Sequence, residues 1–508
     1  MSLASRSVSS FRDRPPIWSR AVVTLAWWHR WLGIMVCLLF AMWFATGAVM
    51  IYVPFPSLSE QQRIALSEPI PLSTLALTPS EALIAAGRGD IRRLRLVGML
   101  GSARYLVELT DGTTLAVAAR SGPANALDPQ QAGRLALAYG VSTKAVPMMV
   151  GHDQWTVHQR FDGSRPFYRV DADDRAGTSI YVSVHTGEVL QRTTSFERSW
   201  NWVGSVLHWI YPTILRRHFH AWDQTVWWLS LVCLVTAATG FVLGILRTFS
   251  LRRKHRGGIS PFRGWMKWHH LLGLTTGLVL LTWIFSGWLS MDHGRLFSLD
   301  RPGESEAQQF HGASLQEAVH GITLDQIGTL AGARELEFIA LAGKPYVILR
   351  GIDSGTGASG VQVVPVKQLT DASARTSQLP DGLLLAAARS AWAGAGVIGM
   401  ERVSREDAYT QLRNDRLPLS TVRFKLGDDA KTWVHVDASS GRILNTMDLS
   451  RRNYRWLYNG LHTFDFPLLN RAGLLWQALM LVALALGFTL SVSAVVLAIH
   501  RLRKGRSR

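Results

Sequence analysis

Two histidines stand at matching positions in different parts of the chain. His29 lies in WWHRWLG and His269 in KWHHLLG, and a long apolar run follows each of them. A histidine in a membrane helix is costly unless a ligand or a hydrogen bond satisfies it. Two neutral imidazoles that face each other in apolar, aromatic surroundings suit the iron of a b-type haem, which they can bind through both axial positions. We therefore predict a haem between His29 and His269, with Arg30, Arg263 and Lys267 near its propionates.

A second pair, His208 and His462, occurs in the equivalent segments VLHWIYP and GLHTFDFP. Both histidines precede an apolar run, which predicts that they approach the membrane from its opposite face. A second haem at this face would divide the hydrocarbon layer, about 30 Å thick, into shorter electron-transfer steps. The cations near enough in sequence to bind its propionates are Arg216, Arg217, Arg455 and Arg471.

Less demanding roles are open to the same histidines. A single histidine at a membrane interface is more often hydrogen-bonded than metal-bound, and His208 and His462 can instead lie on amphipathic helices at the membrane surface. Zinc is an alternative metal for both pairs, although neither pair has the nearby Cys or carboxylate residues that would complete a tetrahedral site. Rival outer ligands, which have no partner in the other half of the chain, are His218, His220 and His293.

Three further histidines lie beside these segments and are not expected to bind haem. His270 points about 100° away from His269 on a helix, so the two cannot share one role. His255 and His500 lie in or beside basic segments, where we expect them to be solvated.

Four stretches carry no charged residue over the length of about 20 residues that a helix needs to cross a bilayer. They are Trp31–Val53, Gln224–Leu246, Leu271–Met291 and Ala472–Ile499. The first is too long for a signal-peptide core and is followed by no convincing small-residue cleavage site, which predicts an anchor that is retained. Helices 1 and 3 of this set run in the same direction. His29 and His269 are therefore expected at one depth of a four-helix bundle, where facing side chains hold cofactors.

The net charge of +18 is concentrated in three short segments. Residues 1–30, 247–270 and 500–508 together hold 17 Lys or Arg and one Asp, so the rest of the chain is nearly neutral. Basic segments beside membrane helices mark the cytoplasmic side. This pattern predicts a multi-pass membrane protein with cytoplasmic N- and C-termini that contacts lipid. It argues against nucleic acid as a partner, because no DNA-reading motif accompanies the charge.

Two long segments, 54–223 and 292–471, separate the apolar stretches on the other side of the membrane. Each contains helical patches followed by alternating strand patterns, such as ARYLVELT in the first and KPYVILRG in the second. These patterns predict an α+β domain in each segment. YVSVHTGEVL in the first segment also corresponds to WVHVDASSGRIL in the second. The chain therefore repeats one unit twice, which usually gives internal pseudo-symmetry with sites at the repeat interface.

The predicted organisation follows the order of these segments. It consists of a cytoplasmic N-terminus with helix 1 (1–53), an outer domain ending in a histidine segment (54–223), helix 2 (224–246), a basic loop with the start of helix 3 (247–270), helix 3 (271–291), a second outer domain with its histidine segment (292–471), helix 4 (472–499) and a basic tail (500–508).

The composition gives little support to other redox groups. Cys37 and Cys233 are the two cysteines and both lie in apolar stretches, so covalent haem attachment and iron–sulfur clusters are not expected. No GxGxxG follows a strand pattern, and no region is typical of a flavin or nicotinamide domain. A haem protein with this sequence would take its electrons from a separate reductase or from a membrane quinol.

WHRWLG, WHHLLG, the membrane glycines Gly47 and Gly287, and the two histidine segments resemble the PepSY-associated transmembrane family. This family includes iron-regulated inner-membrane proteins and ferrisiderophore reductases of Gram-negative bacteria. The resemblance covers residues 22 to 500, and VHTGEVL and VDASSGRIL belong to it. It implies a four-helix core with b-type haem, two periplasmic PepSY-like domains and electron delivery to iron chelates in the periplasm. The ligand positions of the family correspond to His29, His269, His208 and His462. After His208, WIYPTILRRHFH departs from the family's glycine-containing continuation.

These observations predict an α-helical membrane protein with an internal twofold repeat that holds two haems b. It would act as an inner-membrane oxidoreductase that reduces a ferric siderophore or another ferric chelate in the periplasm. Fe(II) fits hard oxygen ligands less well than Fe(III), so reduction would loosen the chelate. The neighbours Arg216, Arg217, His218 and His220 form a basic segment that could dock an anionic chelate or contact lipid.

The competing hypothesis is a non-enzymatic sensor, inhibitor or scaffold anchored in the membrane. PepSY modules take their name from peptidase-inhibitory relatives, and in this case the outer domains would bind a protein and the histidines would be structural. The sequence leaves open which chelate is used, which donor supplies electrons, how many haems are bound and which oligomer forms.

Overall fold

The computed structural model describes residues 17–143, 145–253, 259–353 and 359–506. The chain divides into two compact units. The helical unit lies within residues 1–48, 225–291 and 477–508, and the sheet unit comprises residues 49–224 and 292–476.

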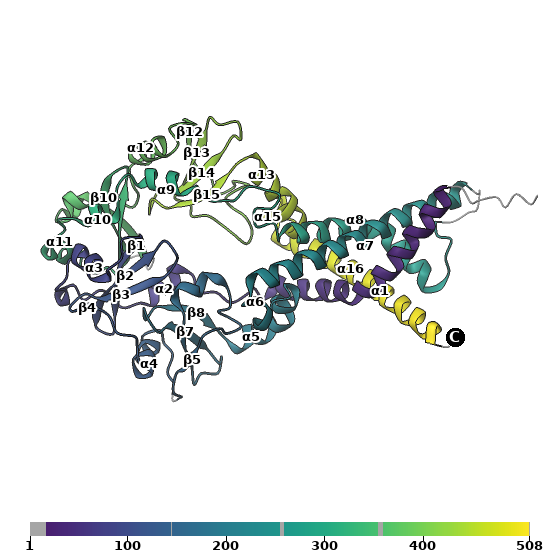
Figure 1. Cartoon of the computed structure of the whole chain (residues 1–508), viewed down its shortest axis with the longest axis horizontal. Coiled ribbons are helices and arrows are strands. Elements are labelled where there is room, and N and C mark those ends of the chain that lie inside the picture. Colours follow the sequence, from purple (N-terminus) through teal and green to yellow (C-terminus); the bar gives the residue numbers. More distant parts are fainter. Residues whose placement is uncertain (1–16, 144, 254–258, 354–358, 507–508) are drawn as a thin grey trace, which may run out of the picture. The chain divides into compact units, whose positions relative to one another are not determined.

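The helical unit is built from four long helices, which Figure 1 labels. They are α1 (Ile17–Tyr52), α7 (Phe219–Arg253), α8 (Gly264–Leu289) and α16 (Gly473–Arg506). All four are long and apolar enough to cross a membrane. Helix α1 begins well before the apolar stretch, so His29 lies about three turns inside it rather than in its first turn. The helix extends this far because residues 17–30 contain no Gly or Pro that would end it.

Small residues allow the helices of this unit to approach one another closely. Phe40 of α1, Cys233 of α7 and Ile284 of α8 belong to one buried apolar cluster. A Cβ atom at Gly487 of α16 would lie 2.4 Å from the ring of Phe44 in α1. Glycine is therefore required where α16 crosses α1, as is usual for helices packed in membranes.

One antiparallel sheet of seven strands runs through both halves of the sheet unit, in the order β11-β10-β9-β1-β2-β3-β4. Its central pair is β1 (Ile91–Met99) and β9 (Glu335–Leu341), which come from different halves of the chain. The outer strands are β2 (Ser102–Leu109), β3 (Thr114–Ala118), β4 (Gly122–Pro123), β10 (Lys344–Asp353) and β11 (Ser359–Pro365). The segments 54–223 and 292–471 therefore share a sheet. Strand patterns within each copy do not reveal this, because any edge strand can pair with another edge.

Each half also has a four-stranded antiparallel sheet of its own. The first contains β5 (Met148–Val150), β6 (Phe167–Asp171), β7 (Ser179–Ser183) and β8 (Val189–Thr193). The second contains β12 (Val397–Arg402), β13 (Thr421–Leu426), β14 (Trp433–Asp437) and β15 (Ile443–Met447). The helices that accompany the sheets are α2 (Glu60–Leu66), α3 (Pro79–Ala86), α4 (Pro129–Ala138), α9 (Glu304–His311), α10 (Leu315–Val319), α11 (Leu324–Gly328) and α12 (Asp381–Ala391).

The main core lies against the seven-stranded sheet and belongs to both halves. It joins Leu83 of α3 and Leu94 of β1 to Val319 of α10 and Phe338 of β9 in one buried cluster. Helices α3 and α10 each begin with a capping box, in which a Thr or Ser and a Glu three residues later satisfy each other's backbone amides. The same local sequence device thus starts the equivalent helix of each copy.

The β1–β2 and β9–β10 hairpins show how the copies correspond. Leu100–Gly101 and Ala342–Gly343 form their two-residue turns, and all four residues have positive φ, as a type I′ turn requires. Counting back from the turns makes Arg95 equivalent to Glu337. These two residues are also direct Cα partners in the β1–β9 ladder. The internal twofold therefore passes between Arg95 and Glu337.

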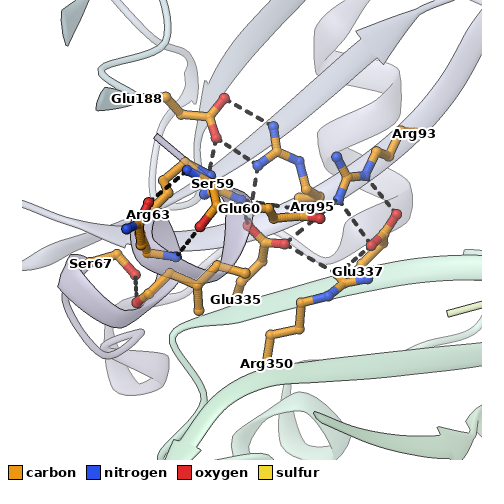
Figure 2. Close-up of polar contacts among 12 residues, drawn as sticks. Ser59, Glu60, Arg63, Ser67, Arg93, Arg95, Glu188, Glu335, Glu337 and Arg350 are labelled. Atoms are coloured by element: carbon orange, nitrogen blue, oxygen red, sulfur yellow. Dashed lines mark hydrogen bonds and ion pairs between the residues drawn. The ribbon is translucent and has the colours of Figure 1, made fainter. Parts of the chain in front are cut away.

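Nine charged side chains form a network where β1 meets β9, and Figure 2 labels all of them except Arg442. They are Arg63, Arg93, Arg95, Arg350, Arg442, Glu60, Glu188, Glu335 and Glu337. Arg95 donates to both carboxylate oxygens of Glu188, at 2.6 and 2.9 Å. Burial alone would raise the pKa of Glu188, but Arg95 and Arg63 outweigh burial and lower it to about 2. The network is therefore ionised at neutral pH.

The charges of this network are reversed between the copies. Glu188 in TGEVL corresponds to Arg442 in SGRIL, just as Arg95 corresponds to Glu337. The Arg95–Glu188 pair of the first copy is thus matched by a Glu337–Arg442 pair, at 2.6 Å, in the second. Two first copies paired through β1 would instead place Arg95 opposite Arg95, and directly opposed like charges are destabilising. The reversal therefore favours pairing between the two different halves.

Candidate functional site

His29 of α1 and His269 of α8 lie together inside the helical unit. Their ring centroids are 6.4 Å apart and their planes are inclined by 33°. Two imidazoles bound on opposite sides of one metal ion have ring centres roughly 6 Å apart, because each metal–nitrogen bond is about 2 Å long. The spacing of the pair therefore fits a metal ion held between them.

Hydrogen bonds from neighbouring helices define the tautomer of both rings. His29 Nδ1 lies 3.1 Å from the carbonyl oxygen of Thr236, which can only accept. His269 Nδ1 lies 2.9 Å from Ser493 Oγ, and this hydroxyl already donates to the carbonyl of Leu490. Both Nδ1 atoms therefore carry the proton and donate. The lone pair of each neutral imidazole is then on Nε2, the arrangement found when a second hydrogen bond orients a metal-binding histidine.

A cavity of about 650 Å³ adjoins both histidine rings and lies within the helical unit. Most of its lining is apolar, and two glycines open it further. Gly33 and Gly273 stand one helical turn after His29 and His269, and a Cβ at either glycine would meet nothing within 4 Å. The shared HxxxG spacing of the two motifs therefore keeps space free beside each ring.

Cationic side chains also line this cavity, and they come mostly from α7 and α16. They are Arg30, Arg247, Arg501 and Lys504. Of the predicted propionate partners, Arg30 lines the cavity, whereas Arg263 and Lys267 are not among the residues that line it. Arg247 and Arg501 are distant from His29 in sequence, so sequence analysis did not place them beside the same cavity. The available signal was the cluster of basic residues at the ends of helices 2 and 4.

Helix α7 contacts the His29 ring through a glycine. A Cβ atom at Gly240 would lie 2.5 Å from His29 Cε1. One turn further along, a Cβ at Gly244 would meet only the Leu274 side chain, at 3.3 Å. The position of the His29 ring thus depends on the absence of a side chain at Gly240.

The other described histidines of this region, His270 and His500, also line the cavity, but they form no pair with His29 or His269. The buried His270 lines the same cavity, but its Nε2 lies 3.1 Å from the carbonyl oxygen of Gly244 and its ring packs on Phe262. His500 is exposed, and His255 lies outside the described residues.

The second predicted pair has the same spacing. His208 and His462, both in the sheet unit, have ring centroids 6.4 Å apart, with planes inclined by 68°. The His462 ring also stacks on Tyr458, at 5.6 Å between centroids and 27° between planes. Residues from equivalent positions of the two copies are therefore brought together a second time.

The segments that carry His208 and His462 share an unusual backbone. Helix α5 (Ser195–Asn201) continues into a π-helical turn, η3 (Trp202–Val206). Likewise α13 (Leu449–Arg455) continues into the π-helical turn η6 (Trp456–Gly460), which leads into α14 (Leu461–Thr463). Such single π-turns occur frequently at functional sites. The sequence analysis did not predict these π-helical turns.

In both segments, the backbone adopts the left-handed conformation two residues after the histidine. Ile210 has φ 49° and Phe464 has φ 51°. A bulky residue in this conformation costs about 1–2 kcal/mol relative to the right-handed region. Strain that recurs at one repeat position suggests a functional constraint on the geometry of His208 and His462.

The rival outer ligands have other neighbours. His293 Nδ1 lies 2.8 Å from a carboxylate oxygen of Asp223, and its ring packs against Phe219. His218 Nε2 accepts a hydrogen bond from Arg217 Nε at 3.0 Å. His220 is exposed.

Arg216 does not form part of the exposed basic segment in which the sequence placed it. Only 2% of Arg216 is exposed, and its guanidinium lies over the rings of Tyr211, Phe219 and Trp222 at 5.0, 5.1 and 4.4 Å. Its Nη2 donates to Gln159. The three aromatic residues that enclose it follow or precede it closely in sequence, but their convergence depends on the break between α6 (Thr213–Arg216) and α7.

Two other predicted propionate partners are already paired. Arg455 is buried and donates to Asp465 at 3.1 Å. Arg471 pairs with the exposed Glu406. Arg217 is the exposed member of the predicted set that forms no ion pair with a described carboxylate.

Four helices able to cross a membrane, joined to a unit of antiparallel sheets, define a multi-pass membrane protein. The family model described as the PepSY-associated TM region matches residues 26–326, more than half of the chain. The protein therefore belongs to the PepSY-associated transmembrane family, which confirms the resemblance. The matched residues include His29, His208 and His269. No curated protein matches the chain.

Proposed function

We propose that this protein is a haem-dependent oxidoreductase of the inner membrane that carries electrons to the periplasmic side and reduces a ferric chelate there, such as a ferric siderophore. The observation that supports this proposal best is the spacing of the histidines. Both repeat-related pairs have ring centroids 6.4 Å apart. Duplication thus brings two imidazoles to the same spacing twice, and two b-type haems would each require such a pair.

The residues around His29 and His269 fit a haem. Both imidazoles have the tautomer that leaves Nε2 free to bind iron, and Gly33 and Gly273 leave room beside them. Arg30, Arg247 and Arg501 would bind the propionates. His208 and His462 would hold the second haem.

A bound haem supplies one-electron chemistry between Fe(II) and Fe(III). The chain's own residues would set how readily this occurs. Hydrogen bonds to Thr236 and Ser493 orient the His29 and His269 rings and raise their basicity as ligands. The apolar lining of the cavity excludes water and lowers the local dielectric constant, which tunes the potential. Electrons would come from a separate reductase or a membrane quinol.

Spectroscopy of the purified protein tests this function directly. We expect a strong Soret band, sharp visible bands after reduction with dithionite, and anaerobic reoxidation on addition of ferric citrate. Gallium(III) citrate, which cannot accept an electron under these conditions, should leave the reduced spectrum unchanged. A colourless preparation from haem-replete cells would contradict the proposal and would favour the scaffold or sensor hypothesis.

Substitution of Gly240 tests the role of the His29 ring position. In Gly240→Ala the new methyl group overlaps His29 Cε1, and overpacking of this kind costs about 1–3 kcal/mol. We expect the ring to move and the haem-to-protein ratio, measured from the Soret band, to fall. Gly244→Ala is the matched control, because its methyl group meets only the flexible Leu274 side chain. Equal haem content in both variants would contradict the role given to Gly240.

A further inference from the structure

A group of exposed basic side chains converges on one surface of the sheet unit. Two segments distant in sequence supply it: His152, His158 and Arg160 lie around η2 (Gln159–Ser164), while Arg217 and His218 follow α6. We call these five residues the basic patch.

Two glutamine side chains, those of the buried Gln154 and the half-buried Gln159, hold the two segments of the basic patch together. Gln154 Nε2 donates to the carbonyl of Tyr211 at 2.8 Å, and Gln154 Oε1 accepts from the backbone amide of Thr213 at 3.0 Å. Gln159 Oε1 accepts from Arg216. These hydrogen bonds fix the position of the two segments relative to each other, so the patch is formed by the fold and not by charges along a single helix.

The positive charge of this surface is only partly balanced, although the carboxylate of Asp162 is near enough to act on His152, His158 and Arg216. Arg160, Arg216 and Arg217 form no ion pair with any carboxylate among the described residues. The nearby Asp162 is engaged by Arg165, at 2.9 Å. Arg216 lies beneath the surface, and its Nε and Nη1 have no hydrogen-bond partner in the described part of the chain. Its buried charge therefore adds to the potential of the patch without forming an ion pair.

The histidines of the patch respond to this potential. Partial enclosure, together with the charges of Arg216 and Arg160, lowers the pKa of His158 to about 4. The pKa of His152 is lowered as well, by partial enclosure and by Arg165. Both histidines are therefore uncharged at neutral pH, and the exposed charge of the patch comes from Arg160 and Arg217. Guanidinium groups bind carboxylate and phosphate oxygens in bidentate fashion.

We propose that the basic patch binds a soluble ligand bearing several carboxylate groups; if the function proposed above holds, this ligand is a negatively charged ferric chelate. The charges converge from a folded loop and a helix end, which suits a compact polyanion better than a lipid headgroup reached from one helix. The patch would thus select a negatively charged substrate, a preference that the paired histidines do not impose.

Equilibrium binding of gallium(III) citrate, a chelate that requires no electron transfer, tests the patch. The wild-type protein in neutral detergent should bind it, and Arg160→Gln combined with Arg217→Gln should weaken binding by about tenfold or more, as expected for the loss of two charge-assisted contacts. The control, Arg301→Gln with Arg405→Gln, removes the same charge from exposed sites elsewhere in the sheet unit and should change the dissociation constant less than about twofold.

Absence of binding by the wild-type protein, or equal weakening in both double variants, would overturn the proposal. Binding measured in nanodiscs tests lipid as the alternative occupant. The affinity for gallium(III) citrate should be the same with phosphatidylglycerol present or absent. If phosphatidylglycerol abolishes binding, lipid headgroups occupy the patch and the proposal fails. Gallium binding by a colourless protein would refute only the redox function. Reduction of ferric citrate that is unaffected by Arg160→Gln with Arg217→Gln would refute only the role of the patch.

Discussion

Replacing His269 with alanine is expected to remove about half of the bound haem while the spectrum of the remaining haem stays intact. The reason is that His29 and His269 form one pair and His208 and His462 another, and the two pairs belong to different units of the chain. His29→Ala should have the same effect, because iron held between two imidazoles loses an axial ligand in either variant. The haem-to-protein ratio and the reduced-minus-oxidised spectrum measure this outcome.

His270→Ala is the matched control for this experiment. His270 is adjacent in sequence, buried and on the same cavity, but its Nε2 lies within hydrogen-bonding distance of the carbonyl of Gly244. We expect it to keep most of its haem. Equal loss of haem at both sites from His269→Ala would argue against two independent pairs.

The second large effect is expected in the charged network of the sheet unit. Glu337→Gln removes a carboxylate that pairs with Arg93, Arg350 and Arg442 and is 3% exposed. The buried Arg350 would then carry charge without sufficient balance. Breaking a buried ion pair in this way costs about 3–5 kcal/mol. We expect the free energy of unfolding of the sheet unit to fall by about this amount, measured by denaturant titration followed by circular dichroism.

Glu406→Gln is the control for the network. The Arg471–Glu406 pair is mostly exposed, and exposed pairs contribute about 0–1 kcal/mol. Adding Arg442→Gln to Glu337→Gln should restore part of the lost stability, because it removes one of the unbalanced charges. A loss no greater than that of Glu406→Gln would show that the network does not depend on its ionised carboxylates.

Much of the helical unit could be predicted from the sequence because its signals are local. Uncharged stretches mark the four helices. His29 and His269 each stand shortly before one of these stretches, and this equivalent position brings their rings together. Gly33 and Gly273, one turn later, are part of the two motifs. Their role in opening the cavity depends on how α7 and α16 pack, which the motifs do not indicate. The same packing explains why Arg247 and Arg501, rather than Arg263 and Lys267, line the cavity.

The sheet unit was less predictable because its main features are non-local. Alternating patterns identify strands, but the pairing of β1 with β9 depends on two edges from different copies. The positive φ of Ile210 and Phe464 has no glycine to indicate it. The exposed basic segment predicted from Arg216, Arg217, His218 and His220 was wrong for Arg216, because three aromatic rings enclose its guanidinium.

The number of haems per chain tests the central claim most directly. The pyridine haemochrome assay on protein purified from haem-replete cells counts b-type haem independently of its environment. Duplicated histidines that converge at two places predict a ratio close to two haems per 508-residue chain. A ratio of one would contradict haem binding by one of the pairs, and a ratio near zero would contradict the role assigned to both.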